Sequence, residues 1–412
     1  TFPERDNVNL PRPQLLLPIL VQHFTELDVL WERREACLDD PVWTARDLAD
    51  IERRAQRHLE GLLLGQGRAL DLARPALQGE ERGAATAAAF VMLDLGVAEL
   101  RAELVAALAA AAPEAAHGIR IALRHRDIAD LEPQLRELAA AGSPLVRACA
   151  CDVLSYHQLP AVAGVRELLD AEDEEIRALA VRCLGRWGGP WTADDLRAQL
   201  AVPGALRAHR AALETSAQLA LPGLLEICRD AAYRDDGSSL EALRFLGVIG
   251  DAVEIPRLQC EVSAAAATDQ SGSPALARGA AALAALGALG SPHGVPILLA
   301  ALERPLLMHA AAAAFLRITG AADVKGAPVP QPAELDAEAA EFWDEHVEVD
   351  PALARRWWQE HGGRFAPAEW WQAGIAVDGW PVDERVPLAG RRDVWLADRY
   401  RRKTAGAAEA MA

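Results

Sequence analysis

The hydrophobic pattern of this chain repeats with a period of about 30 residues. Apolar stripes end in the motif L-G-x-x-G at residues 184–188, 246–250 and 286–290. With the first leucine of the motif as a marker, equivalent positions are Leu93, Leu123, Leu154, Leu184, Leu213, Leu246, Leu286 and Leu316. The intervals are 30, 31, 30, 29, 33, 40 and 30 residues, and the longest contains a polar loop at residues 268–274. Such self-similarity is typical of a solenoid, whose units are too small to bury their own apolar faces.

Each unit is predicted to be a pair of helices, and residues 171–188 illustrate the second one. Asp173 is a favourable N-cap, and the apolar stripe that follows has helical spacing: Ile176, Ala180, Cys183 and Leu184. Gly188 suits the left-handed position just past a helix end. Gly185 costs about 1 kcal/mol relative to alanine inside a helix. We therefore expect Gly185 to let a neighbouring helix approach closely. The unit around Leu213 lacks the terminal glycine.

The first helices of the pairs begin with proline, which loses little in the first turn of a helix. Pro256 and Pro296 occupy this place, each six residues after a terminal glycine. The second helices instead repeat an apolar–arginine pair with a spacing of 30 residues, which places Arg147, Arg177 and Arg207 at equivalent positions. We interpret these arginines as structural partners of neighbouring acidic side chains rather than as a binding site.

Composition agrees with an all-α fold. The chain is 51% hydrophobic but only 5% aromatic, and alanine and leucine, which favour helices, supply most of the apolar content. Strictly alternating β-branched runs are nearly absent, so strands have little support. The predicted architecture is an α-solenoid of stacked helical hairpins.

The two ends of the chain differ from the repeats. Residues 1–80 contain longer amphipathic helices without the repeat ending, as expected of a helical N-terminal cap, and residues 81–320 form the repeat array. Residues 321–340 are a Pro-rich linker. Residues 341–412 form a C-terminal segment that carries seven of the 11 tryptophans, between Trp343 and Trp395.

The paired helices, with D-x-x-[VI]-R before the apolar stripe and L-G-x-x-G after it, resemble HEAT repeats over residues 85–320. They are most similar to the short bacterial kind related to phycobilisome-lyase repeats. The whole layout, with the segment DPALARRWWQEHGGRF at residues 350–365, resembles an uncharacterised bacterial family of about 400 residues. That resemblance implies association with type VI secretion gene clusters, where immunity and accessory proteins accompany toxins. It implies no catalytic residues.

The formal net charge is −18, with 60 acidic and 42 basic residues. An acidic protein repels phosphate backbones, so we expect no nucleic-acid binding. Small basic clusters at residues 124–126 and 207–210 are only weak evidence for nucleic-acid binding. The charge is common among soluble proteins, and it also suits a basic protein partner. No apolar run is long enough to cross a bilayer, and the expected location is the cytoplasm.

The motifs of the common enzyme classes are absent from the sequence, so we expect no catalytic, cofactor-binding or metal-binding residues. His117, His125 and His157 recur with the repeats, and a shared metal site there would require further ligands. The six cysteines form no CxxC pair, and Cys149, Cys183 and Cys228 are predicted to be small buried residues.

The Trp-rich segment is the best candidate for contact with a partner, because Trp and Arg are enriched in interface hot spots. The candidate partner-binding residues are Arg355, Arg356, Trp357, Trp358, Trp370 and Trp371. The alternative is that this segment folds over the last repeat and covers its open end.

Three functions stay open at this point. The preferred one is a non-catalytic, protein-binding solenoid that acts as an immunity protein against a type VI secretion toxin, for which a basic nuclease is one candidate. The second is an adaptor or chaperone that loads an effector onto the secretion spike. The third is an enzyme of lyase or glycosylase type on a HEAT scaffold. A homodimer is an open alternative for the oligomeric state.

Overall fold

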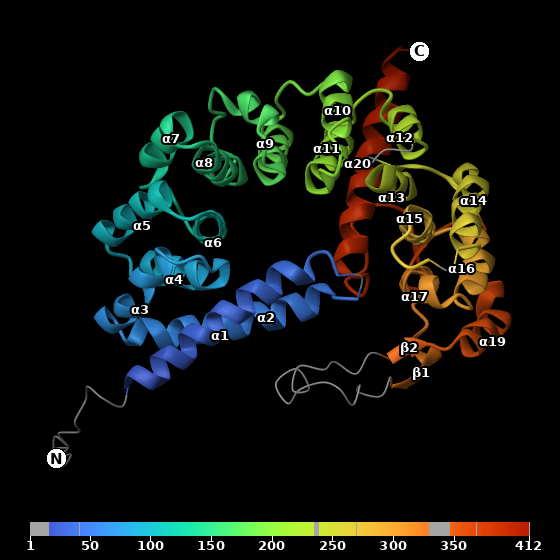
Figure 1. Cartoon of the computed structure of the whole chain (residues 1–412), viewed down its shortest axis with the longest axis horizontal. Helices are drawn as coiled ribbons and strands as arrows, with labels where there is room; N and C mark the ends of the chain where they lie inside the picture. The colour runs from blue at the N-terminus through green and yellow to red at the C-terminus, as the bar shows by residue number, and fades with distance from the viewer. Residues whose placement is uncertain are drawn as a thin grey trace. The chain divides into compact units, whose positions relative to one another are not determined.

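The computed structural model describes residues 16–40, 42–234, 239–268, 270–328, 347–367 and 369–411. The chain divides into two compact units (Figure 1). Unit 1 comprises residues 1–38 and 46–172, and unit 2 comprises residues 39–45 and 173–412. Helices make up 74% of the chain, so the predicted all-α solenoid is confirmed. The predicted four-part domain division stays a prediction.

Unit 1 begins with three helices, α1 (Leu16–Cys37), α2 (Ala45–Leu64) and α3 (Gly67–Leu77). Its repeats follow as α4 (Arg82–Asp94), α5 (Ala98–Ala110), α6 (Pro113–Arg124), α7 (Glu132–Ala141), α8 (Pro144–Tyr156) and the 3₁₀ helix η1 (Val165–Asp170). The second helices α4, α6 and α8 pack against one another in sequence order.

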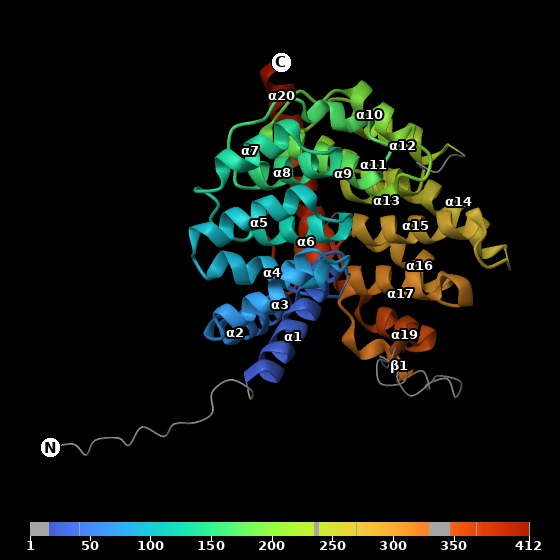
Figure 2. The ribbon, with the colours of Figure 1, turned by 60° about the vertical axis from the view of Figure 1, so that its left-hand side comes forward.

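Unit 2 contains four further second helices, α9 (Glu174–Trp187), α11 (Leu206–Leu219), α13 (Ser239–Ile249) and α15 (Pro274–Leu289), and ends its array with α17 (Pro305–Thr319). The first helices between them are α10 (Ala193–Leu200), α12 (Leu224–Ala232), α14 (Ile255–Ala266) and α16 (Val295–Ala301). Figure 2 shows α13, α15 and α17 stacked one on the next. Pro256 and Pro296 lie in the first turns of α14 and α16, as predicted.

The C-terminal segment of unit 2 adds α19 (Pro351–His361) and α20 (Leu388–Met411). It also contains two short antiparallel sheets that the sequence analysis did not anticipate. In the first, β1 (Lys325–Pro328) pairs with β2 (Val347–Val349), and in the second, β3 (Trp370–Gln372) pairs with β4 (Ile375–Val377). Strands of three or four residues are too short to produce a recognisable alternating pattern. Trp343 and most of the predicted linker lie outside the described residues. In the described part of the chain, no helix is long and apolar enough to cross a membrane.

All eight marker leucines lie on second helices, as predicted, and all except Leu316 are buried. Each buried leucine contributes roughly 1.5–3 kcal/mol to stability. The unit around Leu213 differs in detail: α11 ends at a left-handed Ala220 with φ of 55°, where α9 ends at Gly188 with φ of 63°. The predicted N-cap of α9 is confirmed, because the Asp173 carboxylate accepts a hydrogen bond from the Glu175 amide at 2.8 Å.

The inner glycine of the motif has the predicted role of allowing close approach. A Cβ atom on Gly247 of α13 would lie 2.2 Å from the Ala285 carbonyl oxygen of α15, and one on Gly287 would lie 2.9 Å from the Ala314 Cα of α17. At Gly185 the neighbour is the Thr215 side chain of α11, whose Oγ1 would be 3.0 Å away. Successive second helices therefore pack almost backbone to backbone.

Two of the three repeated arginines, Arg147 and Arg207, and the cysteines also match their predicted roles. Arg147 pairs with Glu167 at 2.9 Å, and Arg207 pairs with Glu175, in the first turn of α9, at 2.8 Å. The three cysteines assigned to the interior are buried: Cys149, Cys183 and Cys228.

Replacement of Gly247 tests the close approach. Gly247→Ala gains helix propensity of about 1 kcal/mol. The added methyl group nevertheless forces the backbones of α13 and α15 apart, and we expect a net loss of roughly 1–3 kcal/mol in the free energy of unfolding. Urea denaturation measures the change. Gly363→Ala is the control, because a Cβ there meets no atom within 4 Å. Equal stability of Gly247→Ala and the wild type would contradict the proposed packing constraint.

Candidate functional site

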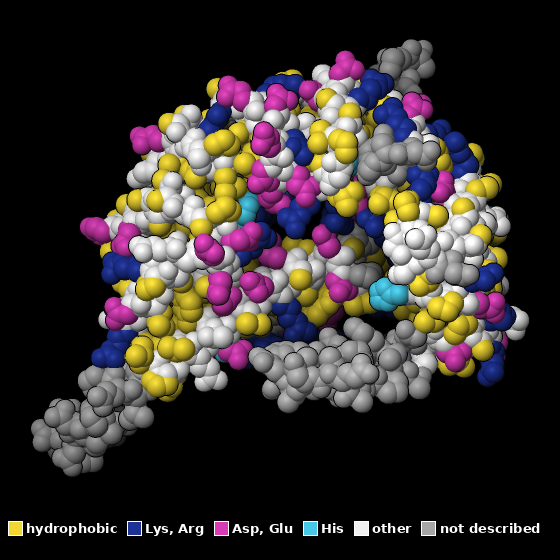
Figure 3. All heavy atoms as spheres, viewed as in Figure 1, with side chains coloured by type: hydrophobic (Ala, Val, Ile, Leu, Met, Phe, Trp, Pro, Cys, Tyr) yellow, Lys and Arg dark blue, Asp and Glu magenta, His cyan; other side chains and the backbone are white. Residues whose placement is uncertain are grey.

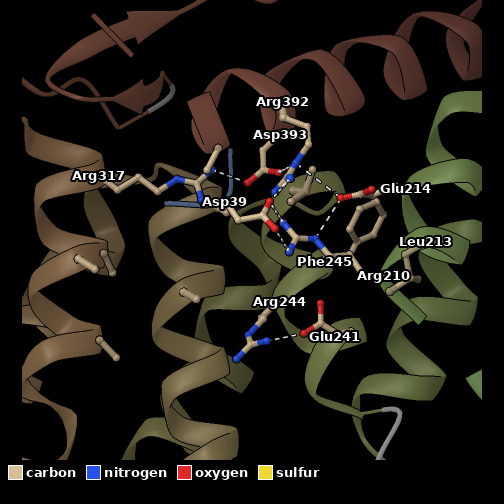
Figure 4. Close-up of a pocket in the computed structure, with 17 residues that line it drawn as sticks. Asp39, Arg210, Leu213, Glu214, Glu241, Arg244, Phe245, Arg317, Arg392 and Asp393 are labelled. Carbon is tan, nitrogen blue, oxygen red and sulfur yellow. Dashed lines mark hydrogen bonds and ion pairs between the residues drawn. The ribbon is translucent and has the colours of Figure 1, made fainter. Parts of the chain in front are cut away.

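Unit 2 has a groove on the face formed by its second helices (Figure 4). Its volume is about 290 Å³, and α11, α13, α15, α17 and α20 supply its lining together with Asp39. Much of the floor consists of alanine side chains: Ala284, Ala288, Ala310, Ala313, Ala314 and Ala389. Leu213, Phe245 and Val248 add larger apolar surfaces. The groove exists because small side chains face it from α15, α17 and α20, where larger ones would fill the space.

A network of ion pairs lies at one end of this groove (Figure 4). The Asp39 carboxylate accepts hydrogen bonds from Arg210, at 2.8 and 3.0 Å, and from Arg392 at 2.5 Å. Glu214 pairs with Arg210 at 3.2 Å. Asp393 accepts a hydrogen bond from Arg317 of α17 at 2.7 Å. Three arginines and three carboxylates therefore balance one another where α20 meets α11 and α17.

The network keeps its members charged. Burial alone would raise the pKa of Asp39, but Arg210 and Arg392 outweigh burial and hold that pKa below its ordinary value. Burial likewise opposes the charge of Arg392, whereas the carboxylates of Glu214, Asp393 and Asp39 raise its pKa above the ordinary value. Asp39 therefore has no proton to donate near pH 7, and Arg392 has none to lose.

A second ion pair borders the groove on α13. The Glu241 carboxylate pairs with the Arg244 guanidinium three residues later. Both side chains line the groove, and Figure 4 shows them apart from the larger network. The groove thus has an apolar floor bordered by pairs of opposite charge, and its eight charged residues sum to zero. This surface suits an apolar segment of a partner with polar flanks, since the apolar centre and polar rim of protein interfaces have the same arrangement.

The C-terminal segment packs along the C-terminal ends of the second helices. At the end of α15, the Trp371 amide donates to the Gly290 carbonyl at 3.0 Å, and the Trp370 indole N–H donates to the Ala288 carbonyl at 3.0 Å. At the end of α17, the Ala373 amide donates to the Arg317 carbonyl at 2.6 Å. Carbonyls in the last turn of a helix have no partner within that helix, so these contacts satisfy them.

Side chains of helix α20 donate hydrogen bonds to carbonyls at the C-terminal ends of two earlier second helices, α11 and α13. Arg399 and Lys403 donate to the Gln218 carbonyl of α11 at 2.8 and 3.2 Å, and Arg401 donates to the Gly250 carbonyl after α13 at 3.4 Å. Cations at a helix C-terminus also complement the negative end of the helix dipole. The segment therefore reaches beyond the last repeat, where the cap was predicted, to α13 and α11.

The six predicted partner-binding residues are divided between surface and interior. On α19, Arg355 is exposed and pairs with Glu303, and Arg356 is exposed. Trp357 and Trp358 are half-buried. In β3, Trp370 is half-buried and Trp371 is buried. None of the six lines the groove, and their role in partner binding stays a prediction.

Sequence reasoning missed the groove residues almost completely. Arg210 belongs to a basic cluster that the sequence shows, but its partner Asp39 lies 171 residues away, and Arg392 of α20 reaches the same carboxylate. The alanines of α15 and α17 look like ordinary helix formers. The only pattern in the sequence that could have indicated the groove is the high alanine content of the second helices. That content is equally compatible with close helix packing and with a groove.

The three repeated histidines do not form a metal site. His157 Nε2 lies 2.9 Å from the Leu123 carbonyl oxygen, and the His125 ring contacts Trp31 with 5.2 Å between ring centroids. Burial, with Arg34, Arg124 and Arg126 nearby, lowers the pKa of His125 to about 3. Among the residues that the structure describes, no three His, Cys, Asp or Glu side chains are grouped to hold a metal ion.

A double-mutant cycle tests the groove network. Asp39→Asn and Arg392→Gln should each destabilise the protein, and the pair should show a coupling of roughly 0.5–3 kcal/mol at pH 7. Because the folded pKa of Asp39 is lowered, its contribution is complete above the ordinary value of 3.8 and disappears as the pH falls through the lower folded value. The control is the pair of Asp383 and Arg385, for which we expect a weaker coupling because solvent screens an exposed ion pair. Equal coupling in the two cycles would contradict a cooperative network.

The stability of the protein should also depend on His125 in acid. The folded pKa is about 3 and the ordinary value 6.5, so only the unfolded state takes up this proton in between. Stability should therefore fall from pH 6.5 towards pH 3. His125→Gln should remove this part of the pH slope in urea denaturation series. Asp28 has the opposite effect, because burial together with Glu32 and Glu81 raises its pKa to about 6. This effect is the same in the wild type and in His125→Gln, so it cancels when the two pH profiles are compared. Parallel pH profiles would exclude the assignment.

Comparison with known protein families gives one match. Residues 132–217 match the family model of HEAT repeats. The matched residues extend from α7 into α11 and include the apolar–arginine pairs at Arg147, Arg177 and Arg207. No curated protein matches the chain. HEAT repeats typically mediate protein–protein interaction, so the match favours a protein-interaction scaffold. Together with the helical architecture, it supports a HEAT-repeat protein.

Proposed function

We propose that this chain is a non-catalytic scaffold whose groove in unit 2 binds an apolar segment of a partner protein. The observation that carries the proposal is the groove itself, which has an alanine floor and ion pairs of both signs at its borders. A volume of about 290 Å³ is at the lower limit for small-molecule pockets. It suits a few apolar side chains of a partner better than a whole small ligand.

The electrostatics of the groove favour binding over catalysis. General acid–base catalysis needs groups with pKa values near the working pH. Asp39 has a lowered pKa, and Arg392 has a raised one. Both shifts move the pKa values of these groups further from pH 7.

The partner class follows from charge and from the resemblance to the family associated with type VI secretion. The chain has a net charge of −18, and Figure 3 shows acidic and basic side chains interspersed on the visible face rather than separated into large fields. We propose that the protein is an immunity protein and that its partner is a toxin with a basic surface, for which a nuclease is one candidate. Long-range attraction would then speed encounter, while the groove would supply the specific contact.

The test is affinity capture with the proteins encoded beside this gene. The intact chain should retain a toxin with nanomolar affinity, and loss of the gene should make cells sensitive to that toxin. Capture of a spike protein or of an effector delivery domain, with loss of secretion instead of self-poisoning, would replace immunity by the adaptor role. Capture of no neighbouring product would overturn both roles.

Two matched variants test the groove. Ala284 is an exposed residue of the groove on α15, and Ala264 is an exposed residue of α14 outside it. Ala284→Glu places a charge on the apolar floor, so we expect the partner to bind at least tenfold more weakly, which corresponds to about 1.4 kcal/mol. Ala264→Glu adds the same charge and should bind as the wild type does. Calorimetric titration measures both affinities, and unchanged binding by Ala284→Glu would exclude the groove as the partner site.

A further inference from the structure

A second cavity of unit 2 lies between the β3–β4 hairpin and α20, and it shares no lining residue with the groove. Its volume is about 600 Å³. Three carboxylates line it, from Glu369, Asp378 and Asp398, together with the Trp370 indole and the Arg401 guanidinium. Ala376 and Val377 of β4 add apolar surface.

The charge of this cavity favours a cation. Asp398 has an internal partner, since the Arg402 Nε atom lies 2.8 Å from its carboxylate. Glu369 and Asp378 are both exposed at the cavity. With Asp398 paired to Arg402, the two exposed carboxylates still outnumber the Arg401 guanidinium by one, so the lining keeps a negative charge that attracts positive groups.

The Trp370 ring at the cavity is held in place, and one guanidinium of the protein already packs against it. The Trp370 indole N–H donates to the Ala288 carbonyl at 3.0 Å, which fixes the ring against α15. The Arg401 guanidinium lies over this ring, 4.9 Å from its centroid. Attraction between a cation and the face of an indole is the strongest of the cation–π contacts in proteins. The Trp370 ring is thus fixed at the cavity wall and packs against a guanidinium there.

The strand beside the cavity indicates that its ligand is a polypeptide. β4 pairs with β3 alone within the described part of the chain, so no strand occupies its second edge there. An extended peptide can add to such an edge through its backbone and place alternate side chains into neighbouring pockets.

We propose that this cavity binds an arginine side chain in an extended segment of a partner protein. The guanidinium would lie between Glu369 and Asp378 near the Trp370 ring, and its aliphatic stem would pack against Val377. Arginine suits the cavity better than lysine, because its planar guanidinium both pairs with carboxylates and stacks on aromatic rings. The proposal does not depend on the groove: the two sites have separate linings, and either can fail without the other.

The test uses the whole chain and a capped Gly-Arg-Gly peptide, with a capped Gly-citrulline-Gly peptide as the neutral isostere. Saturation-transfer NMR titrations should detect weak binding of the arginine peptide to the wild type. The double variant Glu369→Gln/Asp378→Asn should bind it roughly fivefold more weakly or worse, since two exposed charge pairs are lost. Glu384→Gln, which neutralises an exposed acid outside the cavity, should bind as the wild type does.

Two outcomes would overturn the proposal. One is equal binding of the arginine and citrulline peptides, which would mean that charge has no role. The other is equal binding by the double variant and the Glu384→Gln control, which would place the peptide elsewhere. The substituted carboxylates are exposed, so the variants should fold, and circular dichroism checks this.

Discussion

Close contact between successive second helices is the constraint on which the rest of unit 2 depends. Gly247 faces the Ala285 backbone, and Gly287 faces Ala314, with no room for an additional carbon atom. Because the repeat stacks at this distance, α13 requires glycine at position 247 and α15 requires glycine at position 287. Five of the six alanines of the groove floor belong to the same helices, α15 and α17. A groove lined by small side chains is therefore a direct consequence of how the solenoid packs.

The same geometry explains how the C-terminal segment is held. Short second helices that end in a row present a row of carbonyls without helical partners. The β3–β4 hairpin and the arginines of α20 donate to these carbonyls at α11, α13, α15 and α17. The terminal glycines Gly290 and Gly320 also leave room for it, since a Cβ on either would lie 2.3 Å from an atom of this segment. The segment then contributes Arg392 and Asp393 to the groove, so the residues that cover the helix ends also form part of the groove wall.

The sequence predicted the array well because its information is local. Spacing, caps and left-handed glycines each depend on residues within one helical turn, and Leu93 to Leu316 accordingly fall on the eight second helices. The groove depends on contacts that no local pattern encodes. Asp39 meets Arg392, which is 353 residues away, and β3 and the turn after it donate hydrogen bonds to the distant ends of α15 and α17. The tryptophan doublets marked an important segment, but their local pattern could not distinguish a half-buried residue such as Trp358 from a buried one such as Trp371.

Protection of the groove by a bound partner is the most direct measure of the central claim, that the hollow on the second helices of unit 2 is a binding surface. Among the native cysteines only Cys260 is exposed, so a Cys260→Ser background leaves single engineered thiols to report their own surroundings. In that background, the rate of maleimide labelling is compared for Ala284→Cys and Ala264→Cys, with and without saturating partner. The account predicts that the partner slows labelling at position 284 strongly and leaves position 264 unchanged. Equal labelling at position 284 in the free and bound protein would contradict it.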